Sequence, residues 1–235
     1  MRLLLILCCL LAPVAAIADS LLIAAGAGYK KPLTEVYAAF TQDSGIQVQA
    51  AFGNMRQVIA QTRDSDRVDL VVGEQGLLTE TGLFTRFTPL GRGRLVLAYA
   101  HTRLSGYQTL ADTEVERIAL PDPKKAIYGR AATQFLERSG LMPQVREKLM
   151  TVATVPQVSA YLIAGTVDAG FINITDALGI QDKIAGFEEL PSALYDPPII
   201  ALAYPTARPA SEAATAFAEF LGTQKAKAIF AKYGL

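Results

Sequence analysis

Residues 21–40 combine residue types and a spacing that could bind an anion. Residues 21–25 form a short apolar run, which predicts a buried strand. A Gly-Ala-Gly turn at residues 26–28 follows, and its glycines let the backbone bend sharply and approach a ligand closely. A helical pattern begins at Lys31-Pro32, because proline is tolerated in a first turn. This order points unpaired N–H groups beyond the carboxyl end of the strand, where they suit an anion.

Catalytic and metal chemistry has little support in the rest of the chain. His101 is the one histidine, so neither a histidine-based metal site nor a Ser-His-Asp group is expected. The sequence has no phosphate loop of the G-x-x-x-x-G-K type. We therefore expect a binding protein rather than an enzyme, with no cofactor and no metal of its own.

Residues 1–18, MRLLLILCCLLAPVAAIA, have the pattern of a secretory signal peptide. A positive charge at Arg2 precedes an apolar segment, and a small-x-small ending follows at residues 16–18. Cleavage there would leave Asp19 as the first residue of a periplasmic protein and would remove both cysteines. Retention of the segment as an uncleaved anchor is the alternative. The 22 basic and 22 acidic residues balance, which argues against nucleic acid as a partner.

Strand and helix patterns alternate along the chain and predict an α/β fold with mostly parallel sheets in two lobes. The first set has predicted strands at residues 21–25, 46–52 and 68–72, with helices from Lys31, at residues 55–62 and from Gln75. The second set has strands at residues 117–120 and 169–172 and helices at residues 130–139 and 157–164. Two amphipathic helices, residues 211–221 and 224–233, complete the pattern.

Two further apolar runs, residues 95–100 and 199–204, are predicted to be the strands on which the chain crosses between the lobes. Lobe 1 would then comprise residues 19–97 together with 203–235, and lobe 2 residues 98–202. The predicted fold is thus two α/β lobes joined by two crossing strands.

Several motifs in order resemble the periplasmic molybdate-binding protein family of bacterial ABC importers, a class II solute-binding protein family. They are AAGAG after the first strand, FGNMR after the second, VDLVVGE, a DP…YG segment, GTVDAGFINITDAL and the ending AKAIFAKYGL. The resemblance covers essentially the whole chain after residue 18. It implies two lobes that close over an oxyanion, a permease as partner, and a monomer.

The same resemblance implies which positions contact the ligand. The serine of the family's first loop falls on Ala27, beside Gly28, and the FGSSG-type second loop reads FGNMR, with Asn54 as the polar substitute. The family's main-chain donors in the second lobe fall on Tyr128 and Val155. A tyrosine that the family often has falls on Asn173. With Arg56, the expected ligand contacts are Ala27, Gly28, Asn54, Arg56, Tyr128, Val155 and Asn173.

Neutral donors suit a dianion that carries no protons, because N–H and O–H groups match its acceptor oxygens and reject protonated anions. Asn54 is also a fair N-cap for the helix that follows it. Arg56 lies in the first turn of that helix, where the dipole disfavours a cation. One hypothesis is that Arg56 reaches into the cleft and replaces the lost serine donors, and the alternative is a solvated or salt-bridged arginine at the surface. The pairs Lys30-Lys31 and Lys124-Lys125 would attract anions toward the cleft.

The sequence leaves alternatives to molybdate or tungstate as the ligand. A protein of the same fold could bind another oxyanion, a small organic acid or a ferric complex. Iron binders need clustered tyrosines and carboxylates, and only Tyr29 and Tyr128 can be placed near the cleft. A sensory partner in place of a permease also remains open.

Overall fold

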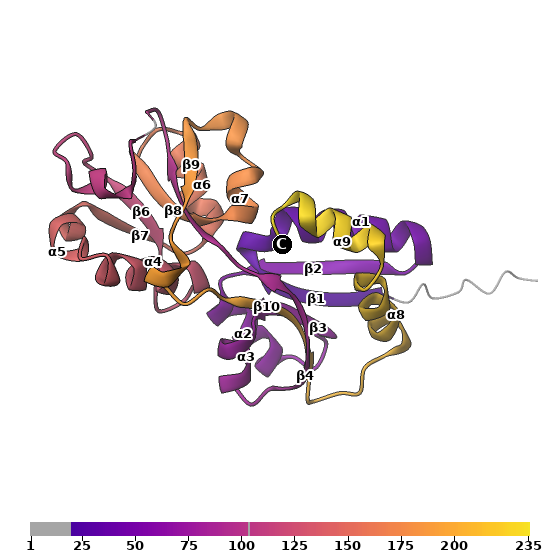
Figure 1. Cartoon of the computed structure of the whole chain (residues 1–235). Helices are drawn as coiled ribbons and strands as arrows, with labels where there is room; N and C mark the ends of the chain where they lie inside the picture. Colours follow the sequence, from indigo (N-terminus) through magenta and orange to yellow (C-terminus); the bar gives the residue numbers. More distant parts are fainter. Residues whose placement is uncertain (1–19, 103) are drawn as a thin grey trace, which may run out of the picture.

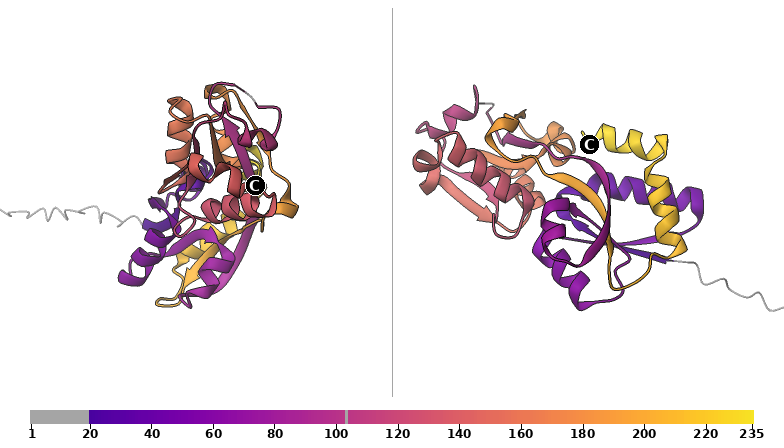
Figure 2. Two further views of the ribbon diagram at one scale, coloured as in Figure 1. Left: turned by 90° about the vertical axis from the view of Figure 1, so that its left-hand side faces the viewer. Right: turned by 60° about the horizontal axis from the view of Figure 1, so that its bottom comes forward.

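The computed structural model describes residues 20–102 and 104–235 and contains two lobes, each built on a five-stranded sheet (Figure 1). The predicted signal peptide, residues 1–18, lies outside the described residues. Helices cover the sheets in both lobes, and the right-hand view of Figure 2 shows the lobes side by side with the chain passing between them twice. No helix in the described ranges is long and apolar enough to cross a membrane.

The first sheet has the strand order β2-β1-β3-β10-β4. Its strands are β1 (Ser20–Gly26), β2 (Gln47–Gly53), β3 (Leu70–Glu74), β4 (Phe84–Arg92) and β10 (Ile199–Pro205). The three strands β2, β1 and β3 are parallel, whereas β10 runs antiparallel to both of its neighbours. In the register of β1 and β2, Gly26 lies opposite Gly53. The loops that follow these two strands therefore begin side by side.

Helices of the first lobe pack their apolar faces on this sheet. They are α1 (Lys30–Ser44), α2 (Met55–Asp64), α3 (Gln75–Glu80), α8 (Glu212–Leu221) and α9 (Gln224–Lys232). In α1 the side chains of Leu33, Val36, Tyr37 and Phe40 are buried, as their helical spacing predicts. Phe40 meets Phe217 of α8 edge to face, with ring centroids 5.1 Å apart. A short 3-10 turn, η1 (Ala27–Tyr29), connects β1 to α1.

The second sheet has the strand order β7-β6-β8-β5-β9. Its strands are β5 (Leu95–Tyr99), β6 (Ile118–Pro121), β7 (Leu149–Val152), β8 (Ala169–Asn173) and β9 (Gly186–Glu189). Its helices are α4 (Ile127–Arg138), α5 (Met142–Val145), α6 (Val155–Ile163) and α7 (Ile174–Leu178). The strands β7, β6 and β8 are parallel, and β5 is antiparallel to both β8 and β9. Each lobe thus combines three parallel strands with an antiparallel pair.

The segments that cross between the lobes differ from the predicted ones. Strand β5 lies wholly in the second sheet and β10 wholly in the first, so neither apolar run is itself a crossing strand. The chain crosses at residues 93–94 and again along residues 190–198, where the Gly93 N–H donates to the Pro198 carbonyl at 2.7 Å. An apolar run predicts burial in a sheet but does not identify which sheet. We therefore propose lobe boundaries at these two crossing segments.

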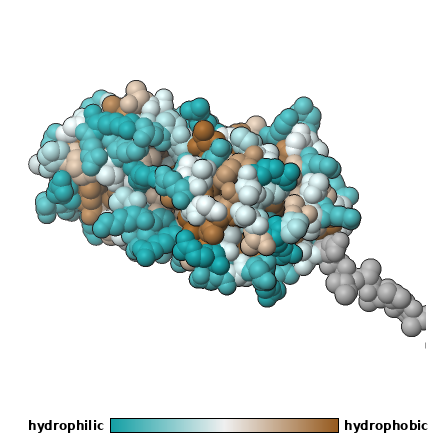
Figure 3. Space-filling model, turned by 90° about the horizontal axis from the view of Figure 1, so that it is seen from below, coloured by the Kyte–Doolittle hydropathy of each residue, from teal (hydrophilic) through white to brown (hydrophobic). Residues whose placement is uncertain are grey.

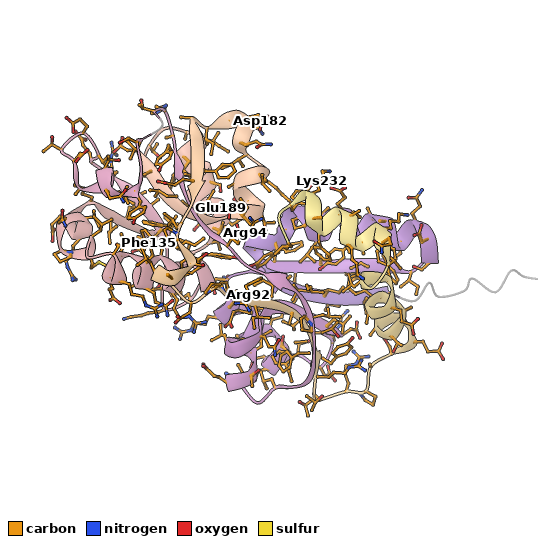
Figure 4. The ribbon with its side chains drawn as sticks, viewed as in Figure 1. Arg92, Arg94, Phe135, Asp182, Glu189 and Lys232 are labelled. Atoms are coloured by element: carbon orange, nitrogen blue, oxygen red, sulfur yellow. The ribbon has the colours of Figure 1, made fainter. Side chains whose placement is uncertain are left out.

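Bonds made by side chains anchor the two crossing segments to the lobes. Arg94 forms an ion pair with Glu189 at 2.7 Å, and the two labelled side chains lie together in Figure 4. The same guanidinium donates to the Gly234 carbonyl at 3.0 Å, which ties the crossing segment to the C-terminal end of the chain. The hydroxyl of Tyr195, on the second crossing segment, accepts a hydrogen bond from the Leu95 N–H at 3.0 Å. The two crossing segments are thus held to each other and to both lobes.

Candidate functional site

A small pocket lies between the lobes, where the ends of strands meet the starts of helices, and we call it the interlobe pocket. Its volume is about 30 Å³. It is lined by Gly26, Ala27, Gly28, Tyr29, Gly53, Asn54 and Met55 from the first lobe and Ala126, Ile127, Tyr128, Thr154 and Val155 from the second. None of these residues is charged. A site of this size holds a few water-sized groups, since one water needs roughly 10–15 Å³ of such volume.

The first lobe contributes the starts of η1 and α2. Because β1 and β2 end in register, Ala27 and Asn54 follow their strands at neighbouring positions. Asn54 is the N-cap of α2: its Oδ1 accepts from the Gln57 N–H at 3.0 Å. The Gln57 side chain in turn accepts from the Asn54 N–H at 3.0 Å, which completes a capping box. The main-chain N–H of Asn54 is therefore already bonded, and its amide NH₂ group is the donor that remains.

The second lobe contributes the starts of α4 and α6. Both helices begin without a side-chain cap, with Ala126 and Thr154 in the cap positions. The first N–H groups of a helix have no partner within it, so the N–H groups at Tyr128 and Val155 are available to a ligand. Gly129 lets α4 start against the end of β6, because a Cβ there would lie 2.2 Å from the Pro121 carbonyl oxygen.

These helix starts make the interlobe pocket favourable for an anion. Four of them, η1, α2, α4 and α6, supply residues to one pocket, and each N-terminus carries a partial positive charge. The donors are neutral, so the pocket provides hydrogen bonds without a cation. Thr154 adds a hydroxyl that does not cap its own helix. The sequence analysis missed Thr154, although its place directly before the predicted contact Val155 could have indicated it.

Buried polar side chains join the lobes beside the pocket. The hydroxyls of Tyr29 and Tyr128 lie 2.7 Å apart in a hydrogen bond. Burial raises the pKa of both tyrosines, and their proximity to each other raises that of Tyr29 further, so both are neutral. Asn173 is fully buried; its NH₂ group donates to the Gly28 carbonyl at 3.0 Å, and its oxygen accepts from the Asp176 N–H. The Tyr29–Tyr128 and Asn173–Gly28 bonds hold the lobes in contact around the pocket.

The structure gathers most of the residues that the sequence singled out. Ala27, Gly28, Asn54, Tyr128 and Val155 all line the interlobe pocket. Asn173 adjoins it through Gly28, but its amide is committed to bonds within the protein.

Arg56 lies elsewhere, in a neighbouring groove with Arg63 and Arg130. Residues of a helix are about 100° apart around its axis, so a side chain two positions after the cap points away from it. Arg56 is thus absent from the lining of the interlobe pocket, and its contact with the ligand stays a prediction.

Two α/β lobes, joined by two crossing segments around a pocket of neutral donors, define a two-lobe solute-binding protein. The family model described as "Bacterial extracellular solute-binding protein" matches residues 21–235, and the chain belongs to this family. This assignment confirms the class that the sequence motifs indicated.

Two proteins that match most of this chain are described as molybdate-binding proteins. The chain is 28% identical over 231 residues to a molybdate-binding protein ModA of Rhodobacter capsulatus, covering 93% of this chain and 89% of that one. The solved structure of the Azotobacter vinelandii periplasmic molybdate-binding protein superposes with a TM-score of 0.81 at 24% identity, covering 91% of this chain and 97% of that one. The predicted two-lobe fold is thereby confirmed.

The fold is also found in proteins described with other ligands. The sulfate-binding protein SubI of Mycobacterium tuberculosis H37Rv superposes with a TM-score of 0.74 at 17% identity, covering 92% of this chain and 86% of that one. The ligand of the present chain therefore has to be argued from its own pocket.

Proposed function

We propose that this protein is the periplasmic binding component of an ABC importer and captures a tetrahedral oxyanion, molybdate or tungstate, in the interlobe pocket. One observation carries the proposal: four helix N-termini supply the lining of a pocket that has no charged side chain. Main-chain N–H groups are fixed donors with a favourable dipole, each helix contributing roughly 0.3–1 kcal/mol at the surface and up to ~2 kcal/mol when partly buried.

The proposed donors come from both lobes. They are the N–H groups at Ala27, Gly28, Tyr128 and Val155, the side-chain amide of Asn54 and the hydroxyl of Thr154. Because a ligand held in this way touches both lobes, binding favours their closed arrangement. Asn173 supports the site by holding the Gly28 carbonyl.

The small volume favours an inorganic anion over a larger ligand. A pocket of about 30 Å³ is far below the 300–1,000 Å³ typical of sites for drug-sized molecules. The Rhodobacter capsulatus relative and the Azotobacter vinelandii structure are both described as molybdate-binding, which favours molybdate among the tetrahedral anions.

The proposal also includes the compartment in which the protein acts and its transport partner. We infer export through the predicted signal peptide, delivery of the anion to a permease, action as a monomer, and no enzymatic activity. The alternative to a permease is a sensory partner protein that binds the closed, ligand-loaded form. Binding by the pocket and delivery to a partner are separate steps, so the first can be tested alone.

A ligand screen with the purified protein tests the binding step. Thermal unfolding is followed with molybdate, tungstate, sulfate, phosphate, chromate and small carboxylates. A ligand that binds only the folded protein adds about 2.7 kcal/mol of stability at 100 times its dissociation constant. We expect the largest shift with molybdate or tungstate. The absence of a shift with every oxyanion would refute the proposal.

A further inference from the structure

A second cavity adjoins the interlobe pocket, and we call it the basic groove. Its volume is about 450 Å³, and it shares Ala126 and Ile127 with the interlobe pocket. Five basic residues line it: Arg56, Arg63, Lys124, Lys125 and Arg130. No acidic residue is among its lining residues. Figure 3 shows the molecule from below, the side of α2 and α3 in Figure 1, with hydrophobic surface among hydrophilic side chains near the middle.

Only part of this positive charge is neutralised within the protein. Arg130 pairs with Glu74 at 2.9 Å, and Lys125 pairs with Asp122 at 2.8 Å. Over residues 20–102 and 104–235, Arg56, Arg63 and Lys124 form no ion pair, and their side chains make no hydrogen bond. The groove therefore holds three cations without an ion-pair partner, of which Lys124 still lies near enough to Asp122 to help lower the pKa of that carboxyl.

The two walls of the basic groove come from different lobes. On α2, Arg56, Ile59, Ala60 and Arg63 follow the spacing i, i+3, i+4, i+7, which places them on one helix face. The facing wall is the segment of residues 123–130, at the start of α4. When the lobes meet, cations of the two walls repel one another across the groove. Arg56 also lies in the first turn of α2, where the helix dipole disfavours a cation.

We propose that the basic groove binds a small organic polyanion, with two or three carboxylate or phosphate groups, which bridges the two lobes. Such an anion offsets the repulsion between α2 and residues 123–130 and so stabilises their contact. The groove is a site separate from the interlobe pocket. The inference thus goes beyond the proposed function and does not depend on which oxyanion the pocket holds.

Volume and lining favour an organic anion over a second inorganic one. The groove has room for a molecule of several heavy atoms, within the 300–1,000 Å³ of typical small-molecule sites. Ile59, Leu77 and Ile127 add apolar wall between the charged groups, which a carbon skeleton can contact. Guanidinium groups such as those of Arg56 and Arg63 bind carboxylate and phosphate with two parallel hydrogen bonds.

A series of carboxylates that differ chiefly in charge tests the proposal by titration calorimetry. The probes are tricarballylate, glutarate and butyrate, with three, two and one carboxylates on a short aliphatic chain. Phosphoglycolate provides the phosphate arm. We expect tricarballylate or phosphoglycolate to bind at least about tenfold more tightly than butyrate, as one added charged hydrogen bond predicts. Equal affinity across the series, or no binding by any probe, would overturn the proposal.

Variants then place the binding in the groove. Arg56→Gln and Arg63→Gln should each weaken the tightest polyanion about tenfold, and Lys124→Gln should weaken it as well. Arg67→Gln and Lys183→Gln remove the same charge from exposed residues that do not line the groove, one in each lobe. These two controls should change affinity less than about twofold, because their charges lie outside the groove and are screened from it by solvent and salt. If the groove variants behave like the controls, the groove is not the site.

Molybdate titration of the wild-type protein separates this inference from the proposed function. No molybdate binding with intact polyanion binding would count against the interlobe pocket alone. Molybdate binding with no polyanion binding would count against the basic groove alone. Simultaneous binding of both would show two separate sites, whereas full competition between them would overturn the claim that the groove is a separate site.

Discussion

Two buried tyrosines allow the same chemical change to be compared in opposite surroundings. The Tyr128 hydroxyl is bonded to Tyr29, whereas the Tyr37 hydroxyl is buried with no hydrogen-bond partner in the part of the chain that the structure describes. Tyr128→Phe removes one hydrogen bond from the buried Tyr29 hydroxyl, which Asn173 also contacts, and should lower the free energy of unfolding by about 0.5–1.5 kcal/mol. Tyr37→Phe removes an unpaired group and should leave stability unchanged or slightly raised. Urea unfolding of both variants measures this, and equal losses would contradict it.

The same tyrosine pair predicts a fall in stability at alkaline pH. Burial raises the pKa of Tyr29 and Tyr128 in the folded protein above the value of about 10 in the unfolded chain. Above pH ~10 the unfolded chain loses these protons while the folded protein keeps them, so stability is full below this pH and falls as pH rises further. Urea unfolding between pH 8 and 11 should show the decline, and the Tyr29→Phe/Tyr128→Phe double variant should show a smaller one. A decline of equal size in that variant would rule out the pair as its source.

At the scale of elements, the start of α2 links helix stability to the interlobe pocket. Asn54→Ala removes the cap on the Gln57 N–H and should cost about 1 kcal/mol of folding stability. It also removes the amide donor that we propose for the anion. Asn54→Ser retains a capping oxygen, so it should keep most of the stability while the amide NH₂ is lost. Paired measurements of urea unfolding and anion affinity separate the two roles; a Ser variant that loses as much stability as the Ala variant would argue against the cap.

Elements with one clear apolar face could be predicted from the sequence, and others could not. The buried face of α1 and the apolar strands β1, β3 and β8 have strong periodic or continuous signals. Strand β4 was missed because most of its residues are partly or fully exposed and Pro89 interrupts the pattern. Helix α7 was missed because five residues are too few to show a helical period.

The candidate site was predictable only in outline. The end of the first strand identifies Ala27 and Gly28, because parallel strands present their carboxyl ends at one edge of a sheet, whereas Tyr128 and Val155 follow from the resemblance to the family. The helical spacing of Arg56 from the cap at Asn54 indicates a direction away from it, but which cavity the side chain then lines depends on the packing of α2 against the second lobe. The Asn54–Gln57 spacing permits a capping box, but whether the Gln57 side chain folds back depends on its local packing.

At the scale of the whole molecule, contacts between the lobes hold the closed arrangement. Glu74 pairs with Arg130, Lys31 lies 3.4 Å from Asp176, and Asn173 reaches the Gly28 carbonyl. The lobes can separate only about the crossing segments, so ligand binding should shift the population of closed molecules. Small-angle scattering should show a smaller radius of gyration with saturating anion. An unchanged radius would count against a closing cleft.

Gly93 offers a sharper test, because it lies where the crossing segments meet the tyrosine pair. A Cβ at this position would lie 2.2 Å from the Tyr128 hydroxyl and 2.9 Å from Pro198. Gly93→Ala therefore cannot adopt the closed arrangement without moving Tyr128, and we expect a larger radius of gyration and at least about tenfold weaker anion binding, the equivalent of 1.4 kcal/mol against closure. The strands of each sheet are untouched, so circular dichroism should retain its folded signal.

Gly91→Ala is the matched control, since a Cβ there comes no closer than 3.3 Å and meets the chain end at Leu235. It should leave both the radius of gyration and the anion affinity near their wild-type values. If Gly93→Ala closes and binds as well as this control, the contact between the crossing segment and Tyr128 does not govern closure. If both variants lose binding, the effect comes from strand β4 and its neighbours rather than from the hinge.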